Sequence, residues 1–285
     1  MPESPVPRFR GVNLLRRVIL IFSALLQVFV ATVAFGQPHF DRSVLLIGNS
    51  MIGPTKVHLT RLSASAGESW RIKGATRGGA RLESFTNGDD PRAIDEIDRK
   101  VWDDVVFVQG TIYWFDGTRD DVSNLAAGEA VRRQIANSTI NAAEVLHRRI
   151  QSADARTVIY MSYPHQLESG HVVESFEPLE RIHWELHDRL SRQTDDATPR
   201  PLLVPVGVLW LHGAKEFGSD AWYKDNLHGS NAAYYANACL FYAFLTDRDP
   251  RPIAYDGGLP PEQARWVREK AWSLHQTYRR PIASE

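Results

Sequence analysis

The sequence predicts an α/β fold in which helices cover both faces of a five-stranded parallel sheet, a three-layer α/β/α sandwich. Two observations lead to this prediction. Short β-branched runs alternate along the chain with longer stretches whose apolar residues recur every three or four positions. Three of the short runs are almost continuously apolar, which is typical of strands that are buried on both faces of a parallel sheet.

Five segments are expected to be strands, because β-branched and aromatic residues are frequent in them and turn-forming residues follow. They are residues 43–48, 70–75, 104–109, 157–162 and 202–206. In open parallel sheets, ligands bind beyond the carboxyl ends of the strands. The loops that follow these five segments are therefore expected to meet around one crevice.

Six segments between and after the strands are expected to be helices, because apolar residues recur in them at helical spacing. They are residues 56–66, 90–100, 125–152, 174–192, 230–245 and 261–278. The last of them begins at Pro260-Pro261-Glu262, and proline is favoured in the first turn of a helix.

The N-terminal region has the features of a secretory signal peptide. Four arginines precede an apolar run at residues 18–35, and Ala34-Phe35-Gly36 supplies small residues at the positions that a signal peptidase reads. We therefore expect cleavage near Gly36, an exported protein, periplasmic or extracellular, and a single domain at residues 37–285. The alternative is an uncleaved membrane anchor, since the apolar run is close to the minimum length for spanning a bilayer.

The charge of the chain bears on nucleic-acid binding, and its cysteine content bears on disulfide bonds. Without residues 1–36 the chain has 29 basic and 33 acidic residues, so no basic excess favours a nucleic-acid partner. Cys239 is the only cysteine, which excludes an intrachain disulfide despite the predicted export. Its apolar, helix-like surroundings predict a buried and unreactive thiol.

The stretch LLIGNS places a serine, Ser50, directly after the first predicted strand. Such a serine can be a turn residue, a helix cap or a nucleophile. A nucleophile needs a base within hydrogen-bond reach and a third group that orients the base. Near the end of the chain, Asp225 and His228 stand three residues apart, just before a predicted helix. This spacing allows the carboxylate to reach one ring nitrogen and leaves the other for Ser50.

Acyl transfer also needs donors for the developing oxyanion. Gly78 and Gly79 follow the second predicted strand, where missing side chains let a backbone N–H approach a ligand closely. Gln109 ends the third predicted strand and offers a side-chain amide at the same edge of the sheet.

These residues, in this order, resemble the conserved blocks of the SGNH, or GDSL-type, hydrolase superfamily. Gly48-Asn49-Ser50 matches the first block, Gly79 the second, and Asp225-x-x-His228 the last. The resemblance runs from about residue 43 to residue 249. It implies a flavodoxin-like sheet, a Ser50–His228–Asp225 triad and an oxyanion hole made by Ser50, Gly79 and the third block. It implies no metal ion and no organic cofactor.

Two positions depart from the family pattern. Asn49 stands where many members have aspartate, next to the nucleophile. Gln109 stands where the third block usually has asparagine, and its extra methylene displaces the amide. Thr111 and the backbone N–H of Gly110 are alternative donors for the oxyanion.

Other motifs are absent or weaker. The sequence around Ser50 lacks the second glycine of G-x-S-x-G, and neither dinucleotide-binding nor P-loop glycine patterns occur. His183 and His187 share one helical face at a spacing that can hold zinc, but no third ligand is evident, so we interpret that face as solvated.

Trp114 and His165 fall in loops at the predicted crevice and are candidates for substrate binding, together with Gly78.

The sequence thus predicts an exported serine esterase that acts on an acyl ester, with acetyl or another short acyl group on a carbohydrate as the substrate class that the family implies. Two alternatives stay open. One is an O-acyltransferase of the same fold, in which a sugar hydroxyl replaces water. The other is a catalytically silent glycan-binding protein, which the unusual Gln109 would explain.

Overall fold

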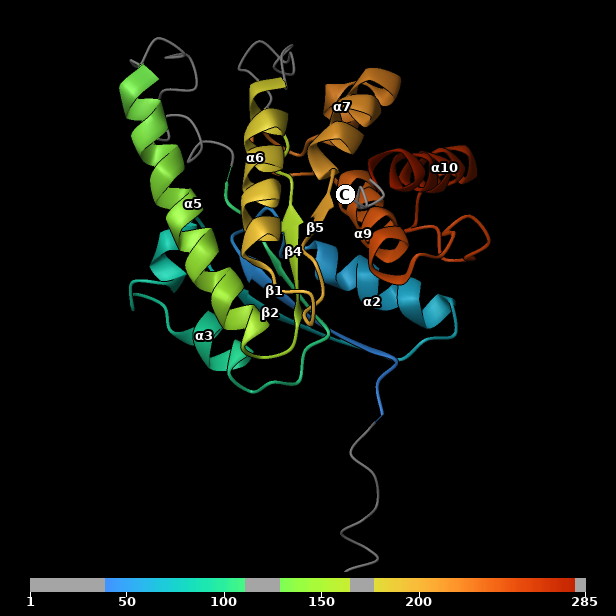
Figure 1. Cartoon of the computed structure of the whole chain (residues 1–285). Coiled ribbons are helices and arrows are strands. Elements are labelled where there is room, and N and C mark those ends of the chain that lie inside the picture. The colour runs from blue at the N-terminus through green and yellow to red at the C-terminus, as the bar shows by residue number, and fades with distance from the viewer. Residues whose placement is uncertain (1–38, 111–128, 165–176, 280–285) are drawn as a thin grey trace, which may run out of the picture. The chain divides into compact units, whose positions relative to one another are not determined.

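Five strands form one parallel sheet in a computed structural model, which describes residues 39–110, 129–164 and 177–279 (Figure 1). The strand order is β2-β1-β3-β4-β5, the order of flavodoxin-like sheets. The chain divides into the units Met1–His39 and Phe40–Glu285, and every element described below belongs to the second unit. The predicted fold class is confirmed.

The strands lie close to the predicted segments. They are β1 (Arg42–Gly48), β2 (Trp70–Thr76), β3 (Asp104–Phe107), β4 (Arg156–Tyr160) and β5 (Leu202–Val204). Gly48 pairs with Thr76 on one side of β1, and Ile47 pairs with Phe107 on the other. The carboxyl ends of β1, β2 and β3 are therefore level. The chain leaves β1 in opposite directions to form β2 and β3, so the end of β1 is the switch point where this topology places a ligand.

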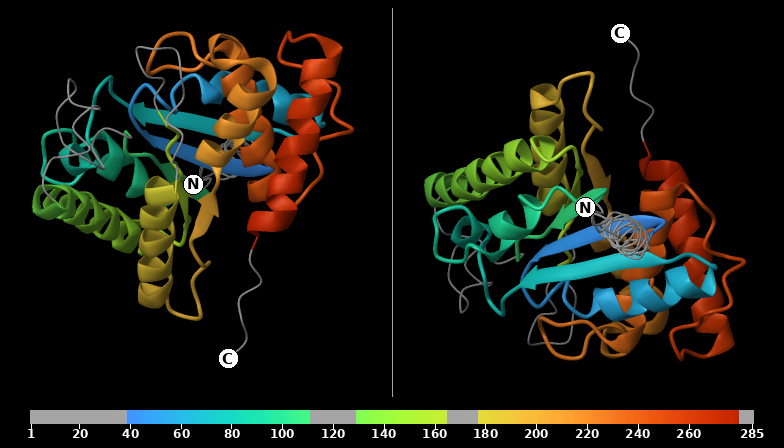
Figure 2. Two further views of the ribbon diagram at one scale, coloured as in Figure 1. Left: turned by 90° about the horizontal axis from the view of Figure 1, so that it is seen from above. Right: turned by 90° about the horizontal axis from the view of Figure 1, so that it is seen from below.

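Helices cover both faces of the sheet (Figure 2). One face carries α2 (Thr55–Ser65) and α9 (Asn231–Thr246), with α10 (Pro261–Tyr278) packed on α9. The other carries α3 (Arg92–Ile97), α5 (Glu129–Gln151) and α6 (Glu177–Gln193). The described remainder consists of three short or connecting helices, η1 (Leu82–Phe85), α7 (Val206–Phe217) and α8 (Ser219–Trp222).

Helix α9 lies at the centre of one of the two helix layers. Nearly all of its side chains are buried, because α2, α7, α8 and α10 all contact it. A helix that is apolar on every side is stable in water only when other elements surround it. Ser230 caps its first turn, with the side chain accepting a hydrogen bond from the N–H of Ala233.

The end of β5 differs from the prediction. The expected strand 202–206 stops at Val204, and Val206 begins helix α7. Pro205 separates the two, since it cannot continue the hydrogen bonding of a strand. The remaining predicted helices are found, although α3 is shorter than expected at both ends.

No helix within the described ranges is long and apolar enough to cross a membrane.

Cys239 is fully buried in α9, and burial raises the pKa of its thiol to about 12. The predicted burial of this cysteine is confirmed, and the raised pKa disfavours the thiolate, which is the reactive form.

Candidate active site

Ser50 lies in a turn between β1 and α2, at the carboxyl edge of the sheet. The turn is set by Gly48, whose φ of +144° is a conformation that other residues rarely adopt. A β-carbon at Gly48 would lie 2.4 Å from Cγ1 of Val108 and 2.8 Å from its carbonyl oxygen. Glycine at this position therefore lets the chain after β3 approach the end of β1.

A chain of hydrogen bonds joins the serine to the predicted histidine and aspartate. Nε2 of His228 lies 2.9 Å from Oγ of Ser50. On the other side of the ring, Nδ1 lies 2.9 Å from Oδ2 and 3.1 Å from Oδ1 of Asp225. Residues 178 positions apart in the sequence are thus brought into direct contact.

The carboxylate of Asp225 determines which ring nitrogen of His228 carries the proton. Because a carboxylate only accepts hydrogen bonds, the proton of a neutral His228 belongs on Nδ1, which leaves the lone pair of Nε2 facing the hydroxyl of Ser50. Burial by itself would raise the pKa of Asp225. Hydrogen bonds from the backbone N–H groups of His228 and Leu227 and from the imidazole outweigh burial, so the pKa of Asp225 is lowered. The carboxylate is therefore ionised at neutral pH.

The loop that carries Asp225 and His228 is fixed by backbone contacts at its base. Tyr223 and Gly229 form an antiparallel bridge, and the N–H of Lys224 donates to the carbonyl of His228. Oδ1 of Asp225 accepts the N–H groups of Leu227 and His228 at 2.8 and 2.7 Å, which closes the loop on itself. The spacing of three residues is what makes this closure possible.

The loop after β2 contacts Asn49, the residue next to this serine. The N–H of Ala80 donates to the carbonyl of Arg77, which closes a tight turn, and Gly79 within this turn has a φ of +65°. The side chain of Asn49, next to Ser50, donates to the carbonyl of Ala80 and accepts the N–H of Met51. An aspartate at position 49 could not donate to Ala80, so asparagine suits this contact between the two loops.

The amide of Gln109 is engaged in a buried network. Its Nε2 donates to Oγ1 of Thr139 at 3.0 Å and to Oε2 of Glu83 at 3.2 Å, and its Oε1 accepts the N–H of Leu82. Both amide hydrogens thus have partners in the fold, and only 2% of the residue is exposed. The amide predicted to serve an oxyanion instead connects η1 with α5 in this structure.

Two tyrosines that the sequence analysis did not single out contact the backbone of the loops that carry Ser50 and His228. The hydroxyl of Tyr234 lies 3.4 Å from the carbonyl oxygen of Ser50, to which it donates, and accepts the N–H of Gly229 at 3.2 Å. The hydroxyl of Tyr163 donates to the carbonyl of Leu227 at 3.0 Å. Tyr234 therefore connects the serine turn with the end of the histidine loop. Neither tyrosine belongs to a motif, so only the fold could reveal them.

Comparison with known proteins shows that other solved structures share this fold. No family model matches the sequence, and no curated protein matches it. Among solved structures, a DUF4886 family protein from Bacteroides uniformis matches with a TM-score of 0.61 at 15% identity, over 82% of this chain and 94% of that one. An acetyl xylan esterase, AlAXEase, matches with a TM-score of 0.50 at 13% identity, over 69% and 96%. The chain has the SGNH hydrolase fold. Identities this low show the fold alone.

The remaining predicted residues of this SGNH-type fold have different outcomes. Gly78 lies in the turn beside Gly79, with open space around the position of a β-carbon. Trp114, His165 and the alternative donor Thr111 lie outside the described residues. Their expected roles in substrate or oxyanion binding stay predictions.

The paired histidines of α6 require a correction. His183 is buried rather than solvated, because its Nδ1 donates to the carbonyl of Leu179 and its Nε2 accepts the N–H of Ser162. Both ring nitrogens are used inside the fold. Within the described part of the chain, no three histidine, cysteine, aspartate or glutamate residues are grouped to hold a metal ion.

Proposed function

We propose that this chain is an exported serine ester hydrolase that removes acetyl or another short acyl group from a carbohydrate. The observation that carries the proposal is the unbroken hydrogen-bonded chain from Ser50 through His228 to Asp225. The fold shared with an acetyl xylan esterase supports the substrate class, as does the signal-like sequence of residues 1–36.

In the first step, Oγ of Ser50 attacks the ester carbonyl while Nε2 of His228 accepts its proton. Asp225 holds the ring through Nδ1 and stabilises the imidazolium that forms. The tetrahedral intermediate then breaks its bond to the alcohol oxygen, and Nε2 returns the proton to that oxygen. The sugar leaves with a free hydroxyl, and the acyl group stays on Ser50.

In the second step, water takes the place of the alcohol. Nε2 of His228 removes a proton from the water, whose oxygen attacks the acyl carbonyl. The second tetrahedral intermediate expels Oγ of Ser50, which recovers the proton from the imidazolium. The products are the carboxylic acid and the original enzyme.

The proposed oxyanion site consists of the backbone N–H groups of Ser50 and Gly79. The contact between Asn49 and Ala80 supports this proposal, because it holds the two loops next to each other. Fixed donors of this kind stabilise charge that develops in the transition state. Gln109 is omitted from the proposal, since both of its amide hydrogens have partners in the fold.

The test is covalent labelling of the full-length protein with a fluorophosphonate, measured as intact mass. We expect a single adduct on the wild type and none on Ser50→Ala. Asp225→Asn is the most informative further variant, because asparagine can still accept the N–H groups of the loop but removes the charge that stabilises the imidazolium. It should slow labelling by about a thousandfold or more.

Absence of an adduct on folded wild-type protein would contradict the proposal and favour the silent glycan-binding alternative. An adduct that persists in Ser50→Ala would show that another residue is the nucleophile. Hydrolysis of p-nitrophenyl acetate by the wild type, lost in Ser50→Ala, would complete the assignment.

A further inference from the structure

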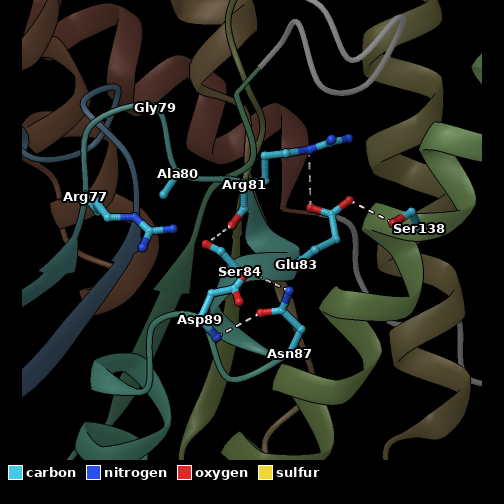
Figure 3. A pocket seen from close by; sticks show the side chains of 9 residues that line it. All are labelled: Arg77, Gly79, Ala80, Arg81, Glu83, Ser84, Asn87, Asp89 and Ser138. Carbon is cyan, nitrogen blue, oxygen red and sulfur yellow. Dashed lines mark hydrogen bonds and ion pairs between the residues drawn. The ribbon is translucent and has the colours of Figure 1, made fainter.

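A cavity of about 430 Å³ begins at Gly79 and extends between the loop after β2, helix η1 and helix α5 (Figure 3). Its volume is within the range of small-molecule sites, about 300–1,000 Å³. Nine residues line it, all labelled in Figure 3, and they include Arg77, Gly79, Ser84, Asp89 and Ser138. Because Gly79 belongs to both, the cavity adjoins the proposed oxyanion site.

Nearly all of the side chains that line the cavity carry a polar group. The only lining side chain without a polar atom is the methyl group of Ala80, and no aromatic residue is included. A fatty acyl chain would find no large apolar side chain to pack against, and burial of apolar surface is the main source of affinity for such chains. The lining includes two cationic side chains, Arg77 and Arg81, and two carboxylates, Glu83 and Asp89, so it has no net charge.

Arg77 has hydrogen-bond donors to offer a ligand. Its Nη1 lies 3.8 Å from Oδ2 of Asp90, which is too long for a hydrogen bond. Asp90 is instead bound by Arg92, which donates to both carboxylate oxygens at 2.8 and 2.6 Å. In Figure 3 the side chain of Arg77 extends from the turn toward Ser84, into the space that the labelled residues surround.

Hydrogen bonds hold together the side of the cavity that η1 and α5 form. Oε1 of Glu83 accepts the hydroxyls of Ser138 and Thr139 at 3.0 and 3.2 Å, and Oε2 accepts the amide of Gln109. These bonds connect η1 with α5 across the cavity. Asn87, also in the lining, donates to Asp89 at 2.8 Å and holds its carboxylate. A site whose walls are held in this way loses little conformational entropy on binding.

We propose that this cavity binds the neutral sugar portion of the substrate, an inference that rests on the proposed ester hydrolase function. Sugar hydroxyls both donate and accept hydrogen bonds, and the lining offers donors on Arg77 and acceptors on Asp89 and Ser84. Since the proposed acyl group is short, the alcohol is the part of the substrate large enough to occupy such a cavity. The balanced charge favours a neutral sugar over a uronate.

A binding measurement tests the cavity without depending on catalysis. Xylotriose, cellotriose, chitotriose and trigalacturonate are each titrated calorimetrically into the full-length Ser50→Ala protein. We expect at least one neutral trisaccharide to bind and trigalacturonate to bind more weakly. If none of the neutral sugars binds, or if trigalacturonate binds best, the proposal is overturned.

Two variants locate the binding. Arg77→Ala keeps the backbone hydrogen bonds of the turn and should weaken sugar binding about tenfold or more. Ser138→Leu introduces a better helix former into α5 and should block the cavity by its size. Arg99→Ala is the matched control, because it removes an exposed arginine that pairs with Glu96 outside the cavity. Equal binding by all three variants would show that the sugar binds elsewhere.

Activity separates this inference from the proposed function. The quantity to compare is the ratio of kcat/KM for an acetylated xylo-oligosaccharide to kcat/KM for p-nitrophenyl acetate. Arg77→Ala should lower this ratio about tenfold, and Arg99→Ala should leave it unchanged. If p-nitrophenyl acetate is hydrolysed but the ratio does not respond to Arg77→Ala, the cavity assignment fails and the hydrolase proposal stands. If Ser50 takes no fluorophosphonate while a neutral sugar still binds, the hydrolase proposal fails and the cavity stands as a sugar site.

Discussion

At the scale of single residues, the proposed chemistry depends on how each polar atom is occupied. Asp225 accepts two backbone N–H groups and the imidazole, so its orientation is determined by a loop of four residues. His228 is then held between this carboxylate and Ser50. The same reasoning leaves Gln109 out of the proposed oxyanion site, because Glu83 and Thr139 accept its amide hydrogens.

Gln109→Ala distinguishes a structural role from an oxyanion role. The substitution leaves the N–H of Leu82 and the side chains of Glu83 and Thr139 without this partner. We expect the free energy of unfolding to fall by about 1–3 kcal/mol in urea titrations. The kcat for p-nitrophenyl acetate should fall less than about threefold, since no donor to the oxyanion is removed.

Thr139→Val is the control for Gln109→Ala, because it removes one partner of the same network and leaves the amide in place. It should lower stability and leave kcat unchanged. A loss of kcat of about 100-fold or more in Gln109→Ala alone is what removal of an oxyanion donor typically causes. That result would return Gln109 to the oxyanion hole.

The sequence predicted part of this site, and the limits have a physical cause. The contact of Ser50 with His228 and Asp225 could be predicted, because the serine follows a strand end, the Asp-x-x-His pair precedes a helix, and this order resembles that of SGNH hydrolases. The contact of Tyr234 with Ser50 and the partners of Gln109 could not be predicted, because these contacts join residues from 26 to 184 positions apart and belong to no motif. No local pattern encodes which rotamer such a side chain adopts.

At the scale of secondary structure, the ends of strands and helices were predicted where the amino-acid composition changes sharply. Gly48 ends β1, and Pro261 begins α10, as expected. Helix α7 was missed because its first residues, Val206-Gly207-Val208-Leu209, form a short apolar run that continues β5 in the sequence. Such a run is compatible with a strand or a buried helix, and periodicity alone cannot distinguish them.

The close approach of β1 and β3 at Gly48 leads to a prediction about stability. In Gly48→Ala the new methyl group would overlap Val108, both at its side chain and at its carbonyl oxygen, and alanine would be strained at a φ of +144°. We expect a loss of about 2–4 kcal/mol in the free energy of unfolding, measured in urea.

Gly74→Ala, in the neighbouring strand β2, is the control for this prediction. A β-carbon there would meet only Thr76 at 3.7 Å, an ordinary contact, so stability should change by less than about 1 kcal/mol. Equal stability of the two variants would show that β1 and β3 can separate without cost. The serine turn would then not depend on glycine.

At the scale of the whole molecule, buried histidines connect the helix layer to the sheet. His147 in α5 lies 2.8 Å from Oγ1 of Thr157 in β4 and 3.2 Å from Oγ1 of Thr194 after α6. His183 in α6 receives the N–H of Ser162 after β4. Both are almost completely buried, and burial lowers the pKa of each to about 4.

These two histidines predict that the fold loses stability in mild acid. In the unfolded chain a histidine has a pKa of about 6.5 and binds a proton as the pH falls, whereas His147 and His183 stay neutral in the fold until about pH 4. The unfolded state therefore binds more protons between these values, and the free energy of unfolding decreases as the pH falls through this window. Between pH 7 and pH 5 the loss is about 2 kcal/mol for each histidine. Urea titrations at the two pH values measure it.

His147→Gln checks the cause of this acid sensitivity, because glutamine does not titrate and can still reach the two threonines. The variant should lose about 2 kcal/mol less than the wild type between pH 7 and pH 5. Burial also lowers the pKa values of His58, His212 and His275, so the wild-type loss should exceed that of the two histidines alone. A wild-type protein equally stable at both pH values would show that His147 and His183 gain protons without leaving their buried positions. If the variant and the wild type lose the same amount, the sensitivity comes from other groups.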